Sequence, residues 1–434
     1  MNIDDIINSI DSNNLDIAFG RVVNISAVTL SAVGLDVAVG DIVRIESAQK
    51  LYTVLGMVTV LKDGLFVIVP FSFIDGFKIN DKVFLQRDGL TVKCGNGLLG
   101  RVVNALGDPI DDLGKIRDLD TNAPINKESM SPLDRGIIDQ KFATGVKAID
   151  SMLTCGKGQK VGIFAGSGVG KSTLMGMIVQ GCEATIKVIA LVGERGREIP
   201  EFIHYNLNNN LENTVIVTAT SDESPLMRKY AAFTAMTIAE YFRDKGYDVL
   251  LMMDSVTRFA MAQREIGLST GEPPVSRGYP PSVFALLPQL MERAGNSKKG
   301  SITAFFTVLV DGDDLNDPIA DQSRSILDGH IVLTRDLTEQ GFYPPINILK
   351  SASRVIDKVV TKEHYNDFLK LKRVLSLIKE NEVLIRVGAY KKGMDLELDS
   401  AIAKKEKARE FLTQGTLEKY SFDEIVANLR KVLI

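Results

Sequence analysis

The stretch GIFAGSGVGKSTLMGMI, residues 162–178, decides the fold of this chain. An apolar run leads into a glycine-rich loop, and a stretch with helical spacing follows, so the sequence predicts a strand, a loop and a helix in that order. Residues 165–172 fit the phosphate-loop pattern A/G-x-x-x-x-G-K-S. Ala165 stands where glycine is usual, and its methyl group is tolerated if its φ is negative, since only a left-handed backbone would exclude it.

The loop carries the groups that a nucleoside triphosphate requires, which are inward-pointing backbone N–H groups, a helix N-terminus and a flexible cation. We expect Lys171 to reach the β- and γ-phosphates and the Ser172 hydroxyl to ligate Mg²⁺. The purely structural alternative is a glycine-rich turn that binds no ligand, and the intact G-K-S-T sequence with its flanking residues disfavours it. The predicted nucleotide-binding residues of the loop are Gly166, Ser167, Gly168, Val169, Gly170, Lys171, Ser172 and Thr173.

Two acidic residues end apolar runs elsewhere in the chain. Asp254 follows VLLMM and Glu194 follows VIALVG. Because the carboxyl ends of the strands face the ligand in an open α/β sheet, we expect Asp254 to hold Mg²⁺ through water and Glu194 to deprotonate the attacking water. An ion pair of Glu194 with Arg195 or Arg197 is an equally open structural interpretation.

The length, composition and charge of the chain limit the classes of protein to which it can belong. The chain has 434 residues, 45% of them hydrophobic and 24% charged, which suffices for two or three soluble domains. A net charge of −4 disfavours a protein that works by coating nucleic acid. The spacing of the cysteines and histidines fits no metal site, so we expect reduced cytosolic thiols and surface or capping histidines. The acidic start and the apolar runs predict neither a signal peptide nor a membrane span.

The residue pattern changes along the chain. Isoleucines at helical spacing predict an amphipathic helix over residues 1–15, which packs on its own domain or on a partner. Short β-branched runs over 16–90 predict a small all-β barrel or sandwich. Over 91–350 apolar strands alternate with helices, which indicates an α/β domain with a mostly parallel sheet, and 100–114 fits a connecting segment. Helical stripes over 351–434 predict a helical domain.

Several stretches together resemble one family: LLGRVVNALGDPID, GERGREIPEF, LLMMDSVTRFAMAQREIGL and LNDPIADQSRSILDGHIVLTRDL. They resemble the hexameric ATPases related to the catalytic subunits of rotary ATP synthases, and most closely the ATPases of type III protein export, the flagellar branch in particular. Ala165 sharpens this resemblance, because rotary catalytic subunits have glycine there. The resemblance implies a RecA-like phosphate-loop NTPase core with an N-terminal β-barrel and a C-terminal helical domain, and ATP and Mg²⁺ as cofactors.

The resemblance also implies roles for individual residues. Glu194 corresponds to the catalytic carboxylate, and Arg195 and Arg258 would face the transferring phosphate. In YPPINILKSASR, Tyr343 would stack on adenine and Arg354 would be an arginine finger that reaches the next subunit's site. On local sequence alone, Arg354 reads as a helix-cap arginine.

The partners follow from the resemblance too. It implies a homohexamer, a coiled-coil stalk that touches the acidic loop DGDDLNDPIAD (311–321), and a dimeric stator-like regulator at the N-terminal helix. It further implies chaperone–cargo complexes on the helical domain, membrane proteins of the export gate, and no specific nucleic acid. The expected place is the cytoplasm, at the inner face of the cell membrane. Core packing of the C-terminal stripes and a solvated turn for the acidic loop are the structural alternatives.

Four other functions remain as alternatives. A rotary ATP synthase catalytic subunit shares the motor chemistry, and so does a virulence-type export ATPase. An RNA-translocating helicase would need basic residues among the stacking aromatics of its barrel, whereas FVIVPFSFIDGF is aromatic and hardly basic. A non-catalytic ATP-binding module would require Glu194 to be dispensable.

Overall fold

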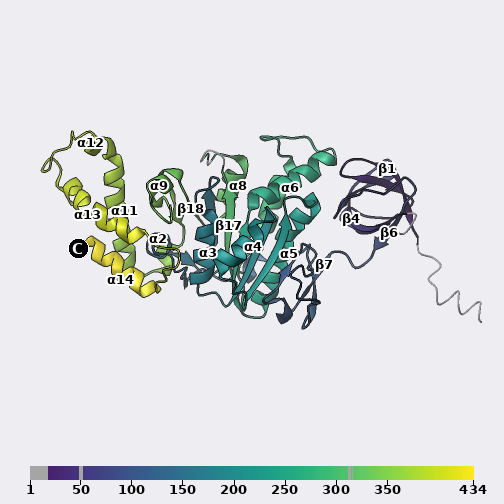
Figure 1. Ribbon diagram of the computed structural model, residues 1–434, viewed down its shortest axis with the longest axis horizontal. Coiled ribbons are helices and arrows are strands. Elements are labelled where there is room, and N and C mark those ends of the chain that lie inside the picture. Colours follow the sequence, from purple (N-terminus) through teal and green to yellow (C-terminus); the bar gives the residue numbers. More distant parts are fainter. Residues whose placement is uncertain (1–17, 48–51, 311–313, 315) are drawn as a thin grey trace, which may run out of the picture.

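The computed structural model describes residues 18–47, 52–310, 314 and 316–434. The molecule is elongated, with a β-barrel at one end, a sheet domain in the middle and a helical domain at the other end (Figure 1). The isoleucine-rich segment predicted as a helix over 1–15 lies outside the described residues.

The barrel confirms the prediction of a small all-β domain. Six strands close it in the order β1-β2-β5-β4-β3-β6. Their apolar side chains alternate inward, and Val22, Val43 and Ile68 are fully buried. The strands are β1 (Gly20–Ile25), β2 (Leu30–Val33), β3 (Ile42–Glu46), β4 (Thr53–Lys62), β5 (Leu65–Pro70) and β6 (Lys82–Gln86).

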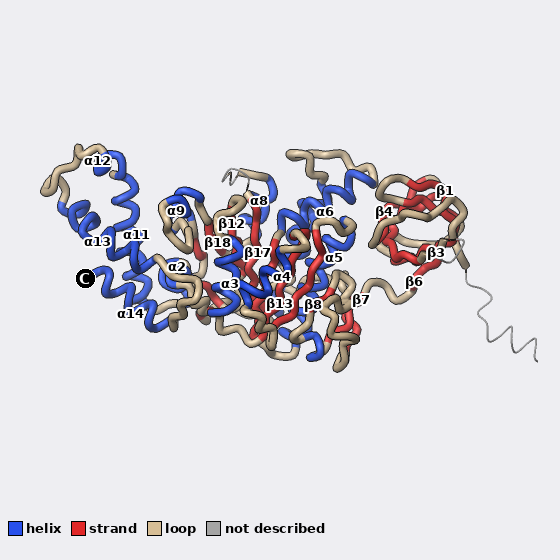
Figure 2. The backbone as a smooth tube through the Cα atoms, viewed as in Figure 1, coloured by secondary structure: helices blue, strands red, loops and turns tan. Residues whose placement is uncertain are grey.

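The central domain contains a nine-stranded sheet in the order β19-β18-β12-β17-β15-β13-β14-β8, with β16 paired to β17. Helices cover the red strands of this sheet in Figure 2. All pairs from β18 to β8 are parallel, whereas β16 and β19 are antiparallel. The strands are β8 (Val102–Val103), β12 (Lys160–Ala165), β13 (Ile186–Glu194), β14 (Thr214–Thr220), β15 (Asp248–Asp254), β16 (Gly295–Asn296), β17 (Ser301–Leu309), β18 (Gly329–Val332) and β19 (Ala352–Ser353).

Two short sheets and one edge strand refine the expected layout. β7 (Thr91–Cys94) pairs with β9 (Thr121–Pro124), and β10 (Lys141–Phe142) pairs with β11 (Cys155–Gly156). The interpretation of 100–114 as a mere connector was wrong, because β8 within it joins the edge of the main sheet beside β14. Two residues are too short a run to show a strand pattern in the sequence.

The helices around the sheet begin where the sequence supplies caps. Ser224 accepts from the Met227 N–H at the start of α5, and Pro225 is the first helical residue. The helices of this domain are α2 (Lys147–Met152), α3 (Lys171–Gly181), α4 (Glu198–Glu201), α5 (Pro225–Asp244), α6 (Val256–Ser269), α7 (Pro281–Met291), α8 (Pro318–Ile326) and α9 (Arg335–Glu339). A π-helical turn, η3 (Phe202–Asn206), follows α4.

The C-terminal part is helical, as predicted. It consists of α10 (Ile356–Val359), α11 (Lys362–Glu380), α12 (Glu382–Arg386), α13 (Leu396–Leu412) and α14 (Phe422–Leu433). Ser421 and Glu424 form the expected capping box of α14. Leu371, Ile425 and Leu429 are buried in the same apolar cluster as residues of α2 and α3, so this domain packs directly on the sheet domain.

The cysteines are free thiols, as expected. His364 is a buried capping histidine: it is 1% exposed, and its Nε2 lies 2.9 Å from the Ser151 carbonyl oxygen in the last turn of α2. None of the helices in the described residues combines the length and the apolar composition needed to cross a bilayer.

Candidate active site

A cavity of about 500 Å³ opens at the carboxyl ends of the parallel strands. β12 leads into the loop 166–170 and α3, while the neighbouring strands β15 and β13 end at Asp254 and Glu194. Lys171, the first residue of α3, also lines the cavity. The fold thus brings together the three residues that the sequence placed at strand ends and in the phosphate loop, as the topology of such sheets requires.

The loop has the backbone that phosphate binding needs. Gly168 has φ +77° and Gly170 has φ +91°, conformations that residues with a side chain rarely adopt. Ala165 ends β12, is fully buried and does not have a positive φ, which is the condition on which alanine was expected to be tolerated. Gly170 is the N-cap of α3, so the first amides of that helix point toward the cavity.

Lys171 lies between two buried carboxylates. Its Nζ is 2.5 Å from Asp254 Oδ1 and 3.8 Å from Glu194 Oε1. Asp254 Oδ1 also accepts a hydrogen bond of 2.7 Å from Thr307 Oγ1, on the adjacent strand β17. Both contacts fall on Oδ1, so Asp254 is held in one orientation and its charge is compensated by the lysine.

Glu194 has the environment of a catalytic base. It is 7% exposed, and Arg258 Nε lies 3.5 Å from its Oε1. Burial, and secondly the Asp254 carboxylate, raise the pKa of Glu194 to about 7, against the opposing effect of Lys171. Within the described part of the chain, Glu194 Oε1 has no hydrogen-bond partner. A buried carboxylate oxygen with free acceptor capacity can take a proton from water near neutral pH.

The two arginines expected at the site, Arg195 and Arg258, both line the cavity but pair with different carboxylates. Arg258 lies on the first turn of α6, whose N-cap Ser255 accepts from the Arg258 N–H, and its side chain reaches Glu194 at the end of β13. Arg195 lines the cavity but pairs with Glu198 at 3.7 Å. The ion pair of Glu194 with Arg195 or Arg197, the structural alternative, is thus replaced by one with Arg258.

Three predicted residues lie outside the cavity wall, as far as the described residues define it. Val169 is 1% exposed, and Tyr343 is 44% exposed on the segment that follows α9. Arg354 is exposed on the surface, where its Nη2 donates 3.3 Å to the Arg324 carbonyl oxygen in the last turn of α8. Within one chain, Arg354 therefore has the helix-end contact that its local sequence suggested.

Sequence reasoning missed part of the wall. Glu198, Glu201, Phe202 and Asn206 line it from α4 and the π-helical turn. Asn206 Nδ2 donates 2.9 Å to the Ser172 carbonyl oxygen and so fixes the start of α3. The motif GERGREIPEF contains the first three of these residues, but Phe202 and Asn206 lie in the π-helical turn, for which the sequence offers no signal.

Such a cavity fits nucleotide hydrolysis, which puts the chain among the phosphate-loop NTPases. Residues 145–353 match the family model described as ATP synthase alpha/beta family, nucleotide-binding domain. Residues 360–431 match the one described as T3SS EscN ATPase C-terminal domain.

Relatives and solved structures extend this similarity over nearly the whole chain. It is 57% identical over 416 residues to the flagellum-specific ATP synthase of Helicobacter pylori strain J99, covering 96% of this chain and 95% of that protein. The assembled ATPase EscN of the enteropathogenic E. coli type III secretion system superposes with a TM-score of 0.91 at 45% identity, covering 96% and 100% of the two chains. EscN in complex with its central stalk EscO gives a TM-score of 0.88 at 44% identity, with the same coverage.

The chain therefore belongs to the family of flagellum-specific and type III secretion ATPases. It is a type III export ATPase that hydrolyses ATP, and its higher identity to the flagellum-specific relative favours the flagellar branch. The match of the C-terminal helices to a type III secretion domain separates it from rotary catalytic subunits.

Proposed function

We propose that this chain is the homohexameric motor of a flagellar protein export apparatus and couples ATP hydrolysis to chaperone release, unfolding and delivery of flagellar subunits to the export gate. The observation that carries the proposal is the phosphate-loop cavity with a buried, incompletely hydrogen-bonded Glu194 beside Lys171 and Arg258. This arrangement supports cleavage of ATP and argues against mere retention of it.

In the proposed reaction Glu194 takes a proton from the water that attacks the γ-phosphorus. Lys171 leaves its position between the carboxylates to contact the β- and γ-phosphate oxygens, where its charge offsets the charge that accumulates in the transition state. Arg258 and Arg195 line the same cavity as Glu194 and would add positive charge near the transferring phosphoryl group. The backbone N–H groups of residues 166–173 cradle the phosphates.

The donor set fits Mg²⁺. Ser172 offers a hydroxyl at the start of α3, and Asp254 offers a carboxylate that Thr307 already orients at 2.7 Å. Mg²⁺ prefers oxygen ligands and keeps several waters, so the Ser172 hydroxyl and, through water, the Asp254 carboxylate would hold it beside the phosphates. When bound, the ion would neutralise charge on the phosphate oxygens.

The place of Arg354 supports the proposed ring of subunits. Its side chain is exposed and lies outside its own chain's cavity wall, so it is available to a neighbouring subunit. A guanidinium that enters the next site only on closure would link hydrolysis to assembly. EscN was solved as an assembly, which supports a ring for this similar chain.

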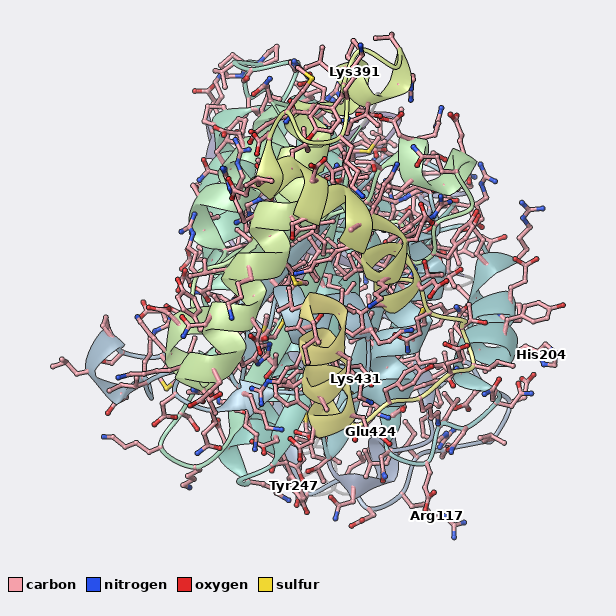
Figure 3. All side chains as sticks on the ribbon, turned by 90° about the vertical axis from the view of Figure 1, so that its left-hand side faces the viewer. Arg117, His204, Tyr247, Lys391, Glu424 and Lys431 are labelled. Carbon is pink, nitrogen blue, oxygen red and sulfur yellow. The ribbon has the colours of Figure 1, made fainter. Side chains whose placement is uncertain are left out.

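The further partners are proposed from charge, exposure and similarity. Asp314 and Asp317 belong to the acidic loop proposed to face a coiled-coil stalk, in line with the EscN–EscO complex; Asp313 lies outside the described residues. The tip of the helical domain, near the labelled Lys391 in Figure 3, is proposed to dock chaperone–cargo complexes. It exposes apolar side chains at Val383, Val387, Met394 and Leu396.

The remaining assignments complete the proposal. Residues 1–15 would bind the dimeric stator-like regulator, 16–90 form the barrel domain, 91–350 the RecA-like domain and 351–434 the helical domain. The hexamer would work in the cytoplasm against the inner face of the membrane, at the export gate.

Assembly is the test of this proposal. Turnover per subunit is measured from nanomolar to micromolar protein, with ATP and Mg²⁺ varied, while sedimentation reports ring formation. We expect turnover per subunit to rise cooperatively as rings form. Equal turnover in dilute subunits and in rings would contradict a motor whose sites are completed by neighbours.

A further inference from the structure

Gln414 stands at the boundary between the sheet domain and the helical domain. It follows the end of α13, is 3% exposed and uses both ends of its amide. Oε1 accepts 2.8 Å from the Lys147 N–H, and Nε2 donates 2.9 Å to the Gly145 carbonyl oxygen and 3.0 Å to that of Glu418. The side chain therefore fixes residues 413–415 to the turn before α2.

The backbone of the same residue holds a second segment. The Gln414 N–H donates 2.8 Å to the carbonyl oxygen of Tyr343, the residue proposed to stack on adenine. Five residues earlier, Arg409 Nη2 donates 2.9 Å to the Gln340 carbonyl oxygen. Two hydrogen bonds from the end of α13 and the residues after it therefore hold residues 340–345, which are called the tyrosine segment below.

The tyrosine segment and the turn before α2, both hydrogen-bonded to Gln414, lie against the phosphate loop and α3 respectively. Pro345 Cδ lies 3.9 Å from where a Cβ would stand at Gly170, so the tyrosine segment passes the phosphate loop with room for about one methyl group between them. On the other side, Gly145 has φ +73° and is so close to Gly181, the last residue of α3, that an added Cβ would lie 2.9 Å from the Gly181 Cα. Gln414 is therefore hydrogen-bonded to two segments, one of which lies beside each end of α3.

The turn that receives Gln414 is itself rigid. Asp150 accepts 2.9 Å from the Thr144 N–H and 2.9 Å from the Gly145 N–H, and its carboxylate is fully buried. A fixed turn on one side and a fixed tyrosine carbonyl on the other leave little freedom to residue 414. Displacement of the helical domain would have to break these hydrogen bonds or carry the tyrosine segment along.

We propose that Gln414 is a positioning residue for nucleotide binding: through it the helical domain sets the place of Tyr343 against the phosphate loop. The proposal rests on the proposed role of Tyr343 in binding adenine. By reciprocity, a ligand that displaces the helical domain changes the affinity for ATP, and ATP changes the freedom of the helical domain.

The test compares the Gln414→Met variant with a matched control in the full-length protein. Gln414→Met keeps the shape and removes all the side-chain hydrogen bonds, while Gln86→Met makes the same replacement at an exposed position of β6 in the barrel. We expect Gln414→Met to raise KM for ATP about tenfold with kcat within about twofold, the effect of losing binding that is equal in ground and transition states. Gln86→Met should change neither.

A double-mutant cycle separates positioning from general destabilisation. If Gln414 acts through the tyrosine segment, Gln414→Met adds less than about twofold to the KM of Tyr343→Ala, because the contact it positions is already gone. Multiplicative effects of the two substitutions, or an unchanged KM in a folded Gln414→Met protein, would overturn the proposal. Lys171→Ala reports separately on the proposed function, since it abolishes ATP binding whatever the role of Gln414.

Hydrogen exchange of the unaltered protein tests the same coupling without any substitution. The amide of Gln414 is the donor to Tyr343, so ATP that stacks on Tyr343 should slow exchange in the peptide that contains residue 414 by about tenfold or more. An exchange rate that ATP binding leaves unchanged in this peptide would refute the coupling.

Discussion

Replacing Glu194 by glutamine removes the proposed base and keeps the size of the side chain. The carboxylate is 7% exposed at the end of β13, with Lys171 Nζ at 3.8 Å and Arg258 Nε at 3.5 Å from its Oε1. An amide in the same place can still accept a hydrogen bond from water but cannot take its proton. The substitution therefore tests proton transfer with little change in packing.

The expected loss is set by the chemistry of the missing group. A positioned general base contributes about 10²–10⁴-fold, or roughly 3–5.5 kcal/mol of barrier. Because burial raises the pKa of Glu194 to about 7, the base works close to its optimum, and the loss should lie in the upper part of that range. ATP affinity should stay the same or rise, since the substitution removes a buried negative charge that would face the phosphates.

Phosphate release at saturating Mg²⁺–ATP and equilibrium binding of ATP measure the two quantities. Glu201→Gln is the matched control, because Glu201 lines the same cavity but is exposed, and it should cost less than about threefold. A Glu194→Gln protein that keeps a tenth of its turnover, or that loses ATP binding along with turnover, would refute the assignment of the base.

Three further predictions concern stability and coupling. Arg293 is fully buried and bonds Glu240 at 3.1 and 2.7 Å, so Arg293→Met should lower the free energy of unfolding by about 3–5 kcal/mol, with partial recovery in the double variant with Glu240→Met, by denaturant titration. Arg101 holds the pKa of Asp111 down to about 2 through two hydrogen bonds, so this contribution is complete above about pH 5 and fades as pH falls through 3.8 toward 2; Asp111→Asn should cost about 2 kcal/mol at pH 7 and well under about 1 kcal/mol at pH 2. Asp314→Lys should leave basal ATPase intact and abolish stimulation by the stalk protein in a phosphate-release assay; retained stimulation would remove this loop from the stalk interface.

The sequence predicted those parts of the protein that depend on local pattern. The phosphate loop, the strands that end at Glu194 and Asp254, the barrel and the capping box at Ser421 each have a period or a motif of their own. The topology of parallel sheets then brings strand ends together, so the grouping of the two carboxylates with Lys171 also followed.

What the sequence could not show depends on contacts between distant segments. The arginine that pairs with Glu194 is Arg258, 64 positions later, and not the adjacent Arg195, because the fold packs α6 against β13. Gln414 carries no motif, yet it joins residues 145, 147 and 343. The side-chain direction of Asn206 likewise depends on a π-helical turn.

The central claim is that each site is completed by the next subunit, and mixing two inactive proteins tests it most directly. Lys171→Ala and Arg354→Ala proteins are each expected to be inactive alone. In random mixed rings about one interface in four pairs an intact phosphate loop with an intact Arg354, so turnover should recover to about a quarter of the unaltered level. Mixed rings that form but remain as inactive as either parent would contradict the account.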